Sequence, residues 1–488
     1  MIAQETLTKI VGKANVLSDQ AVLESYSSDM SFVSPVRPDC VVKPQNAEDV
    51  ENIVRMAKET LTPLVPVSSG PPHFRGDTIP GTGGAVVIDL SGMKKIIRVD
   101  RENRVAMFEP GVTFGELIPA VTKEGLRLNM PLQPRATKSV AASMLEREPV
   151  VMPQYHWDIA DPMNCVEIYF GTGEMFRTGA AAGPGNIEEQ WAAGGAQVEA
   201  AGPSSNSWYR IIQGSQGTMG IITWASARCE IVPRYEQAFL VGTTELDRAL
   251  DIMHWLVRLR IANECFTLNA ADLATVMAKQ WPVEYQAIKE ELPQWLVFYN
   301  LAGYDYLPEE RVEGRIVDAV EVAQKLQLEP ARAIGGVSAA ELLTLAQNPS
   351  KEPYWKLRYK GGCQDVMFLA NNDRLPELVD TMYAMADYSG YPATDIGVYI
   401  QPLVQGSNTH CEFNLFYDPD NTRESEKVRD LTERATKELM NRGAFFSRPY
   451  GETTDMIMNR DAATVNTLKK VKRILDPNNI MNPGKLCF

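Results

Sequence analysis

A short loop near the N-terminus has residue types that suit the binding of a phosphate group. Residues 66–76, PVSSGPPHFRG, continue an apolar stretch that is typical of a β-strand. A loop that exposes backbone N–H groups after a strand can cradle a pyrophosphate. Its two prolines have no N–H to donate, so the contacts must come from Ser69, Gly70 and residues 73–76. The alternative is an ordinary surface turn.

Histidine and cysteine do not predict a metal site. The seven cysteines are scattered, odd in number and never spaced as CxxC, so neither a zinc site nor an iron–sulfur cluster is expected. They are most simply reduced, buried thiols. His254 lies in an apolar helical segment and is most simply a packed side chain. No metal ligands are therefore assigned.

The closing segment carries a more specific pattern. Residues 474–485, ILDPNNIMNPGK, end an amphipathic helix at Pro477, and two Pro/Asn/Gly turns then fix the direction of Lys485. Further motifs precede it in the chain: EPGV at 109–112, TKSVAAS at 137–143, ER at 146–147, RTG at 177–179 and GSQGTMGIIT at 214–223. In order and spacing these motifs resemble those of the vanillyl-alcohol oxidase and p-cresol methylhydroxylase superfamily of FAD enzymes. In that superfamily TKSVAAS corresponds to "GGSVxGN" and Glu146-Arg147 to the start of "ERG".

The resemblance implies FAD as cofactor and an α+β fold. In this fold two α/β subdomains surround FAD, and a substrate (cap) domain contains an antiparallel sheet flanked by helices. The expected domains are an FAD-binding domain at 1–235, a substrate domain at 236–440 and a C-terminal segment at 441–488 that returns to the first domain. The residues implied to bind the cofactor are Ser69, Gly70, His73, Phe74, Gly76, Ser139, Ser143, Gly220, Ile221, His410 and Lys485.

Two branches of the superfamily compete at the substrate site. The 2-hydroxyacid dehydrogenases typically bind a divalent metal through "HxxGDGNxH" and a later "EHG", because the metal polarises the hydroxyacid. Here Leu403 stands at the first histidine, only His410 remains of that motif, and Pro449 replaces the glutamate. A metal site with three ligands cannot be built from these residues.

The phenol-oxidising branch, which includes 4-cresol dehydrogenase and vanillyl-alcohol oxidase, agrees better. Asp158 falls on its catalytic aspartate and Arg448 on the arginine that binds the substrate phenolate. A guanidinium there favours ionisation of a phenol, and the phenolate assists loss of hydride to flavin N5. Ser447 departs from the branch, which usually has a tyrosine at this position. Asp158 could instead be a helix cap or an ion-pair partner, and Arg448 could only brace a carboxylate.

Some members of the superfamily attach FAD through a histidine. His410 aligns with the attachment histidine of the substrate domain, and His73 lies in the loop that another subgroup uses. Covalent attachment through either residue and non-covalent binding both remain open.

Hydrophobic periodicity places the motifs on elements. Asn46 is expected to cap a helix whose apolar positions fall at i, i+3, i+4 and i+7. A hairpin is predicted for 165–179, a helix opening at Thr113, and a loop-rich stretch for 179–207. Further along, helices are expected around 246–260 and 308–326, and a strand at 295–299.

Composition limits the class of protein. The 488 residues are 44% hydrophobic and 23% charged, as in an enzyme of two or three domains. A formal net charge of −14 argues against nucleic-acid binding, which needs clustered Lys and Arg. Neither a leader segment nor an apolar run long enough to span a bilayer is visible. A cytoplasmic location is therefore expected.

Three functions follow from these observations. The first is an FAD-dependent oxidase or dehydrogenase that takes hydride from a para-substituted phenol or related aromatic alcohol. The second is a metal-independent 2-hydroxyacid or alcohol dehydrogenase, in which Arg448 binds a carboxylate. The third is a flavin-binding subunit without chemistry of its own. The sequence leaves open the substrate, the electron acceptor, which could be a partner protein, and the oligomeric state, although relatives often form homo-oligomers.

Overall fold

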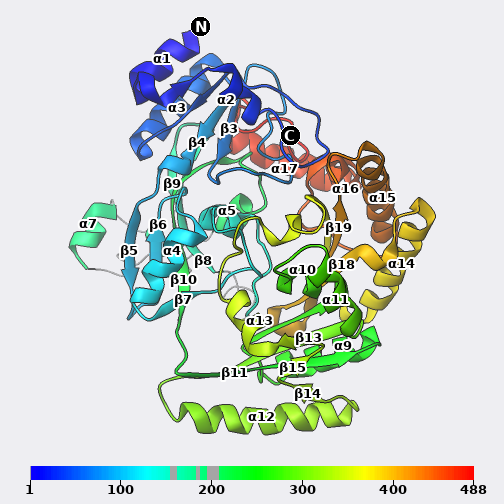
Figure 1. Cartoon of the computed structure of the whole chain (residues 1–488). Coiled ribbons are helices and arrows are strands. Elements are labelled where there is room, and N and C mark those ends of the chain that lie inside the picture. The colour runs from blue at the N-terminus through cyan, green and yellow to red at the C-terminus, as the bar shows by residue number, and fades with distance from the viewer. Residues whose placement is uncertain (1, 154–161, 183–186, 195–207) are drawn as a thin grey trace.

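The computed structural model describes residues 2–153, 162–182, 187–194 and 208–488. Within these ranges the strands form three larger sheets, with helices packed around them (Figure 1). The N-terminal elements and the first half of the chain lie in the upper left of the view, and the third sheet with its helices lies to the lower right.

The first sheet has the order β1-β2-β4-β3. Its strands are β1 (Val16–Leu17), β2 (Cys40–Val42), β3 (Leu64–Val67) and β4 (Val86–Asp89). Both β2 and β3 pair with β4 in parallel, and α3 (Ala47–Thr60) connects β2 to β3. As predicted, Asn46 caps α3 by accepting a hydrogen bond from the backbone N–H of Asp49. The loop that follows β3 therefore leaves the carboxyl edge of the parallel strands, where open α/β sheets bind ligands.

The second sheet is antiparallel, with the order β5-β6-β10-β8-β9, and β7 also pairs with β10. Its strands are β5 (Ile96–Asp100), β6 (Val105–Phe108), β7 (Leu126–Leu128), β8 (Met163–Phe170), β9 (Met175–Arg177) and β10 (Gly220–Ile231). The predicted hairpin is β8 with β9. The predicted helix after Thr113 is α4 (Phe114–Lys123), which begins with a capping box between Thr113 and Glu116.

The third sheet is also antiparallel, with the order β14-β11-β13-β12-β18-β19-β17. Its strands are β11 (Tyr235–Thr243), β12 (Glu264–Asn269), β13 (Trp295–Gly303), β14 (Pro330–Ala331), β17 (Gly362–Ala370), β18 (Ile396–Leu403) and β19 (Asn408–Tyr417). The predicted strand at 295–299 and the two predicted helices are present, the latter as α9 (Leu246–Arg258) and α12 (Pro308–Lys325).

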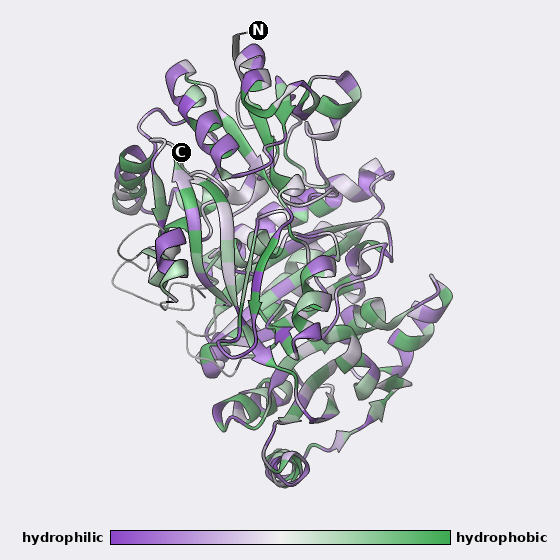
Figure 2. Cartoon of the chain, turned by 90° about the vertical axis from the view of Figure 1, so that its left-hand side faces the viewer, coloured by the Kyte–Doolittle hydropathy of each residue, from purple (hydrophilic) through white to green (hydrophobic). Residues whose placement is uncertain are grey.

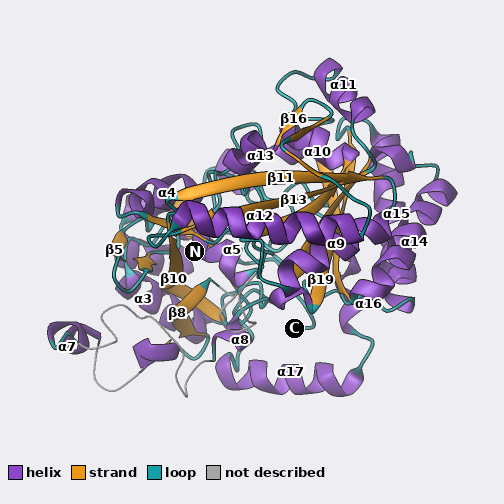
Figure 3. Cartoon of the chain, turned by 90° about the horizontal axis from the view of Figure 1, so that it is seen from below, coloured by secondary structure: helices purple, strands orange, loops and turns teal. Residues whose placement is uncertain are grey.

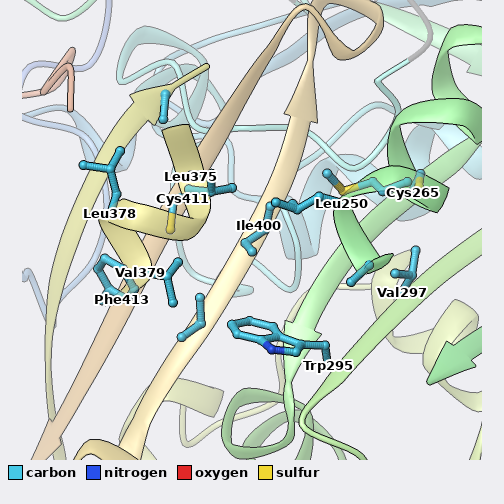
Figure 4. Packing of buried hydrophobic residues seen from close by; sticks show 14 of the residues in the cluster. Leu250, Cys265, Trp295, Val297, Leu375, Leu378, Val379, Ile400, Cys411 and Phe413 are labelled. Carbon is cyan, nitrogen blue, oxygen red and sulfur yellow. The ribbon is translucent and has the colours of Figure 1, made fainter. Parts of the chain in front are cut away.

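Buried apolar side chains join the helices to this sheet. Leu250 of α9 and Leu378 of α14 (Leu375–Ser389) pack over strands that contribute Cys265, Ile400 and Phe413 (Figure 4). Seen from below, α12 lies across β11 and β13 (Figure 3). The strands are mostly apolar, whereas many helices carry one apolar and one polar face (Figure 2), as expected for helices that cover a sheet.

The C-terminal segment returns to the first sheet. It follows α15 (Thr422–Asn441), which packs against α14 and the third sheet. It contains α16 (Thr454–Met458) and α17 (Ala462–Leu475), and the residues beyond α17 lie beside the N-terminal elements (Figure 1). Ile480 and Met481 are fully buried against β3 and β4, and Met481 forms a parallel bridge with Leu64.

The remaining elements are α1 (Ile2–Val11), α2 (Gln20–Ser25), α5 (Val140–Leu145), α7 (Ile187–Ala192), α8 (Tyr209–Ile212), α10 (Ala270–Met277), α11 (Val283–Glu291), α13 (Ala339–Ala346), β15 (Ala333–Ile334) and β16 (Val337–Ser338). The structure confirms the predicted α+β class, including the antiparallel sheet flanked by helices. The domain limits 1–235, 236–440 and 441–488 stay predictions. None of the helices in the described ranges combines the length and apolar character that crossing a bilayer requires.

Candidate active site

A cavity of about 1690 Å³, including the solvent at its mouth, is lined by residues of all three sheets. Val67 belongs to β3, Ile222 to β10, and Tyr399 to β18. We call this space the first cavity. The segments that sequence motifs assign to cofactor binding thus converge on one place.

Four predicted cofactor-binding residues line the first cavity: Ser69, His73, Phe74 and Gly220. Ser139 stands behind this wall. Its backbone N–H donates to Ser69 Oγ at 3.0 Å, and its own Oγ donates to the carbonyl of Pro110 at 2.5 Å. These two bonds join the TKSVAAS motif to the loop after β3 and to the EPGV motif.

Gly76 and Lys485 support the loop from outside the cavity. Gly76 has φ +73°, and a Cβ at this position would lie 2.4 Å from Val33 Cγ2, so only glycine fits. Its N–H donates to Asp29 Oδ2 at 2.7 Å, and its carbonyl accepts from Lys485 Nζ at 2.7 Å. The N–H of Gly76 is therefore engaged within the protein rather than presented to the cavity.

The other predicted positions are spread around the site. The carbonyl of Gly70 accepts a bond from Arg135 Nη1 at 3.2 Å, and Ile221 is buried in the core beneath β3 and β4. Ser143 and His410 line a second cavity, described below. Asp158 lies outside the described residues.

The first cavity has the features that a dinucleotide needs. Gly217, with φ +72°, brings the GSQG loop so close to Pro66 that a Cβ would lie 2.4 Å from Pro66 Cγ. The absence of a Cβ thus lets the GSQG backbone pack directly on the Pro66 ring at the cavity wall, where its backbone N–H groups can face a ligand. The residues present fit FAD.

A buried cluster of four charges, Arg75, Lys138, Glu146 and Glu148, lies on the wall of the first cavity. Lys138 Nζ is 2.9 Å from Glu146 and 2.8 Å from Glu148, and Arg75 pairs with both carboxylates. Burial alone would raise the pKa of Glu148, but Lys138 and Arg75 outweigh burial and hold this pKa well below its ordinary value. Each cation of the cluster therefore pairs with both of its carboxylates.

A second buried cluster belongs to the third sheet. Lys356 Nζ lies 2.9 Å from Asp365 Oδ1 and also pairs with Glu412. His410 Nε2 is 3.4 Å from Glu412 Oε2, without hydrogen-bond geometry. Burial opposes the charge of Lys356, yet the two carboxylates raise its pKa well above the ordinary value. This pairing fixes the strands that carry His410.

Arg448 joins the first cavity to a neighbouring one. The second cavity, about 830 Å³ including open solvent, shares with the first Pro131, Glu148, Pro149 and Arg448. Arg448 is buried, and its Nη1 has no hydrogen-bond partner among the described residues. Burial and then repulsion from Arg75 lower the pKa of Arg448, so an anion in either cavity would meet a guanidinium that forms no ion pair within the described part of the chain.

Both candidate attachment histidines are neutral at physiological pH. Burial lowers the pKa of His73 to about 4, with Arg135 adding to the effect. Burial also lowers the pKa of His410 to about 4, against the opposing influence of Glu412. Of the two, His73 lines the first cavity and His410 the second.

Comparison with known families decides the identity of the fold. Residues 38–179 match the FAD binding domain family, and residues 370–486 match the C-terminal domain of FAD linked oxidases. The chain belongs to the p-cresol methylhydroxylase-type (PCMH-type) flavoprotein superfamily. FAD is therefore its cofactor, as predicted, and it is an FAD-linked oxidoreductase.

A solved structure agrees with this assignment. Substrate-bound p-cresol methylhydroxylase superposes with a TM-score of 0.83 at 19% identity, over 100% of this chain and 96% of that one. Among relatives, glycolate oxidase subunit GlcD of Bacillus subtilis is 23% identical, covering 99% of this chain and 96% of its own length. The 4-cresol dehydrogenase flavoprotein subunit of Pseudomonas putida is also 23% identical, covering 99% and 94%. Equal identity to both leaves the substrate class of this PCMH-type chain to be argued from its site.

We expect chelators to leave the activity of this PCMH-type protein unchanged. Leu403 and Pro449 occupy the positions at which metal-dependent relatives have ligands, and no group of three His, Cys, Asp or Glu residues in the described part of the chain could hold an ion. Turnover would be measured before and after EDTA treatment. If EDTA abolished turnover and added zinc or manganese restored it, the prediction that the site works without a metal would be wrong.

Sequence reasoning missed several residues of the site. Lys138 and Glu148 each stand where the superfamily motifs have glycine, at the second glycine of "GGSVxGN" and the last of "ERG". The two substitutions pair with each other at 2.8 Å. Opposite charges at two such motif positions were the available signal. Asn129, Lys356 and Glu412 gave no comparable signal because they lie outside the motifs.

Proposed function

We propose that this PCMH-type protein removes hydride from a para-substituted phenol or related aromatic alcohol. The observation that carries the proposal is the buried guanidinium of Arg448, unpartnered at Nη1, at the wall shared by the cofactor cavity and an apolar second cavity. A phenolate oxygen would complete the hydrogen bonding of this group and leave its aromatic ring among apolar side chains.

Bound FAD supplies the hydride acceptor. Arg448 lowers the pKa of the phenol and holds the phenolate, whose negative charge assists departure of hydride from the para side chain. Asp158 is proposed to take up or direct the accompanying proton. The apolar walls exclude water: they include Phe114, Met144, Val150, Leu369, Leu403 and Val404.

The walls of the second cavity favour a phenol over a 2-hydroxyacid. A small hydroxyacid is polar over most of its surface. The 2-hydroxyacid dehydrogenases of this superfamily typically bind their substrate with the help of a metal ion, for which this site lacks the ligands. Here most of the lining is apolar, and of its two cations, Arg147 and Arg448, it is Arg448 whose Nη1 has no hydrogen-bond partner among the described residues, which suits an aromatic ring with one ionised oxygen. The hydroxyacid remains the second candidate, since Arg448 would also accept a carboxylate.

An anaerobic substrate screen tests the proposal. Purified holoprotein would be mixed with para-substituted phenols, 2-hydroxyacids or buffer, and reduction of FAD would be followed by loss of its visible absorbance. Bleaching by phenols alone is the expected result. Bleaching by hydroxyacids alone would move the protein to the second candidate, and no bleaching with any compound would favour a flavin-binding subunit without chemistry.

The covalent state of FAD is a separate proposal. A bond through His410, or through His73, would leave FAD in the protein pellet after acid precipitation. Because both imidazoles are neutral, each is competent as a nucleophile. His410→Ala and His73→Ala identify which residue carries the bond, and release of FAD from the parent would exclude a covalent link.

An electron-acceptor protein is proposed as a partner. Support comes from the Pseudomonas putida relative, which is named as the flavoprotein subunit of its enzyme. We also propose a homo-oligomer, as is common in the superfamily.

A further inference from the structure

The second cavity contains an unpartnered polar atom that the proposed chemistry does not use. Asn129 lines this cavity, its side chain is buried, and its Oδ1 has no hydrogen-bond partner in the part of the chain that the structure describes. The side chain is 6% exposed, so bulk solvent does not satisfy it. A buried amide oxygen without a partner destabilises the fold, and its presence beside a cavity therefore points to a ligand.

The position of Asn129 is fixed by the fold. It directly follows β7, whose Leu126 and Leu128 are buried and pair with β10. The residue after next, Pro131, also lines the cavity. Asn129 therefore belongs to the wall that the second sheet supplies, whereas His410 comes from β19 of the third sheet and Arg448 from the C-terminal segment.

Two unsatisfied groups of complementary type face the same space. Arg448 Nη1 is a donor without an acceptor, and Asn129 Oδ1 is an acceptor without a donor. They do not bond to each other, although both line the second cavity. A single molecule can satisfy both if it carries an acceptor for Arg448 and a separate donor for Asn129, and a phenolate with a hydroxyl group on its side chain carries both. A hydroxyl group suits either orientation of the amide, since it can donate to Oδ1 or accept from Nδ2.

We propose that Asn129 is a specificity-determining residue that selects a phenol bearing a neutral hydroxyl group on its para side chain, a 4-(hydroxyalkyl)phenol, over a 4-alkylphenol. This inference rests on the proposed function and narrows its substrate class. An alkylphenol would satisfy Arg448 but leave the buried amide of Asn129 without a partner. A site built to hydrogen-bond a hydroxyl group of the substrate strongly rejects an analogue without that group. An apolar pocket rejects an analogue with an extra hydroxyl group much less strongly.

The reaction of the preferred class balances without a further reagent. The carbinol C–H bond breaks with transfer of hydride to FAD, the hydroxyl proton leaves, and the carbon becomes a carbonyl. The substrate is oxidised and FAD is reduced by two electrons. An alkylphenol, by contrast, would need a water molecule to complete its conversion to an alcohol.

The test compares two compounds that differ only in this hydroxyl group, 4-(hydroxymethyl)phenol and 4-methylphenol. Anaerobic reduction of FAD would be measured for each compound with the parent, Asn129→Leu and Asn129→Asp. In Asn129→Leu we expect the second-order rate constant for reduction of FAD to fall roughly 10- to 1,000-fold for the alcohol. For 4-methylphenol the same constant should change less than about threefold. Asn129→Asp keeps an acceptor and should retain most of the preference for the alcohol.

Val150→Ala is the matched control, because Val150 lines the same cavity without a polar group. It should affect the two compounds alike. FAD content and thermal midpoint would be compared for every variant. If Asn129→Leu does not fold, the preference for the alcohol is measured in Asn129→Asp instead. An equal effect of Asn129→Leu on both compounds, or none, would overturn the role of Asn129 while leaving the phenol proposal intact. Failure of both compounds to reduce the parent would overturn the proposed function itself.

Discussion

Arg448→Ala is expected to slow reduction of FAD by the substrate roughly 30- to 1,000-fold, which corresponds to about 2–4 kcal/mol of lost charge stabilisation. The reason is that Arg448 is the cation shared by the cofactor cavity and the second cavity, and its Nη1 is free for an anionic oxygen. The measurement is the anaerobic rate of flavin bleaching at saturating substrate, together with FAD content per chain.

The structure predicts that this substitution spares the fold. No ion pair to Arg448 occurs among the described residues, so its removal leaves no carboxylate buried and unpaired. Arg448→Lys keeps the charge but not the planar donor pair, and should recover part of the rate. A parent rate in Arg448→Ala with the true substrate would show that the substrate site has been placed wrongly. Loss of FAD in both variants would instead indicate a role in cofactor binding.

Local patterns predicted much of the fold. Asn46 and Thr113 were identified as helix starts from cap chemistry and apolar spacing, and both caps are formed. The hairpin of β8 and β9 was predicted from a strand that turns at residues 171–173 into a second short strand, and the two strands pair. Such features depend on interactions between residues close in sequence, where turn and cap preferences dominate.

The polar networks of the site could not be predicted in this way. Lys356 pairs with Glu412 across 56 residues, and Arg75 pairs with Glu148 across 73. Lys356 and Glu412 lie outside the motifs, and although Arg75 and Glu148 lie in motif segments, those motifs do not indicate that the two residues pair. Charged residues are usually solvated, so the sequence gave no reason to place these pairs in a cavity.

The same limit applies to the division of roles within the site. Motif resemblance grouped Gly76 and Lys485 with Ser69 and His73 as cofactor-binding residues. The structure separates them, because Gly76 is engaged by Asp29 and Lys485, whereas Ser69 and His73 line the cavity. A shared motif identifies the residues that build a loop, while only the folded chain shows which of them face a ligand. Asp158, outside the described residues, keeps its sequence-based role as a proposal.

Removal of residues 474–488 is expected to abolish FAD retention, although no residue of this segment lines the first cavity. The segment instead forms hydrogen bonds that hold the walls of the cavity together. The Leu64 N–H donates to the Ile480 carbonyl at 2.7 Å, and the Asn482 N–H donates to the Leu64 carbonyl at 2.8 Å. The side chain of Asn482 then donates to the carbonyls of Asp77 at 3.0 Å and Gln216 at 2.7 Å. Both of these residues line the cavity.

Asn482→Gly gives a milder version of this experiment that keeps the fold. Asn482 has φ +39°, and glycine adopts positive φ without strain, so the substitution removes the side-chain hydrogen bonds and leaves the backbone path possible. Loss of two hydrogen bonds that join cavity walls should weaken FAD binding roughly 5- to 100-fold, at about 0.5–1.5 kcal/mol for each bond. FAD fluorescence titration of the apoprotein measures the affinity, and gel filtration of the truncated chain measures retention.

Asn478→Gly is the matched control, because Asn478 lies in the same turn but donates only to Lys58 at the exposed surface. If Asn482→Gly binds FAD as tightly as Asn478→Gly does, the segment closes the fold without shaping the cofactor site, because the hydrogen bonds between the cavity walls would then contribute nothing to FAD affinity.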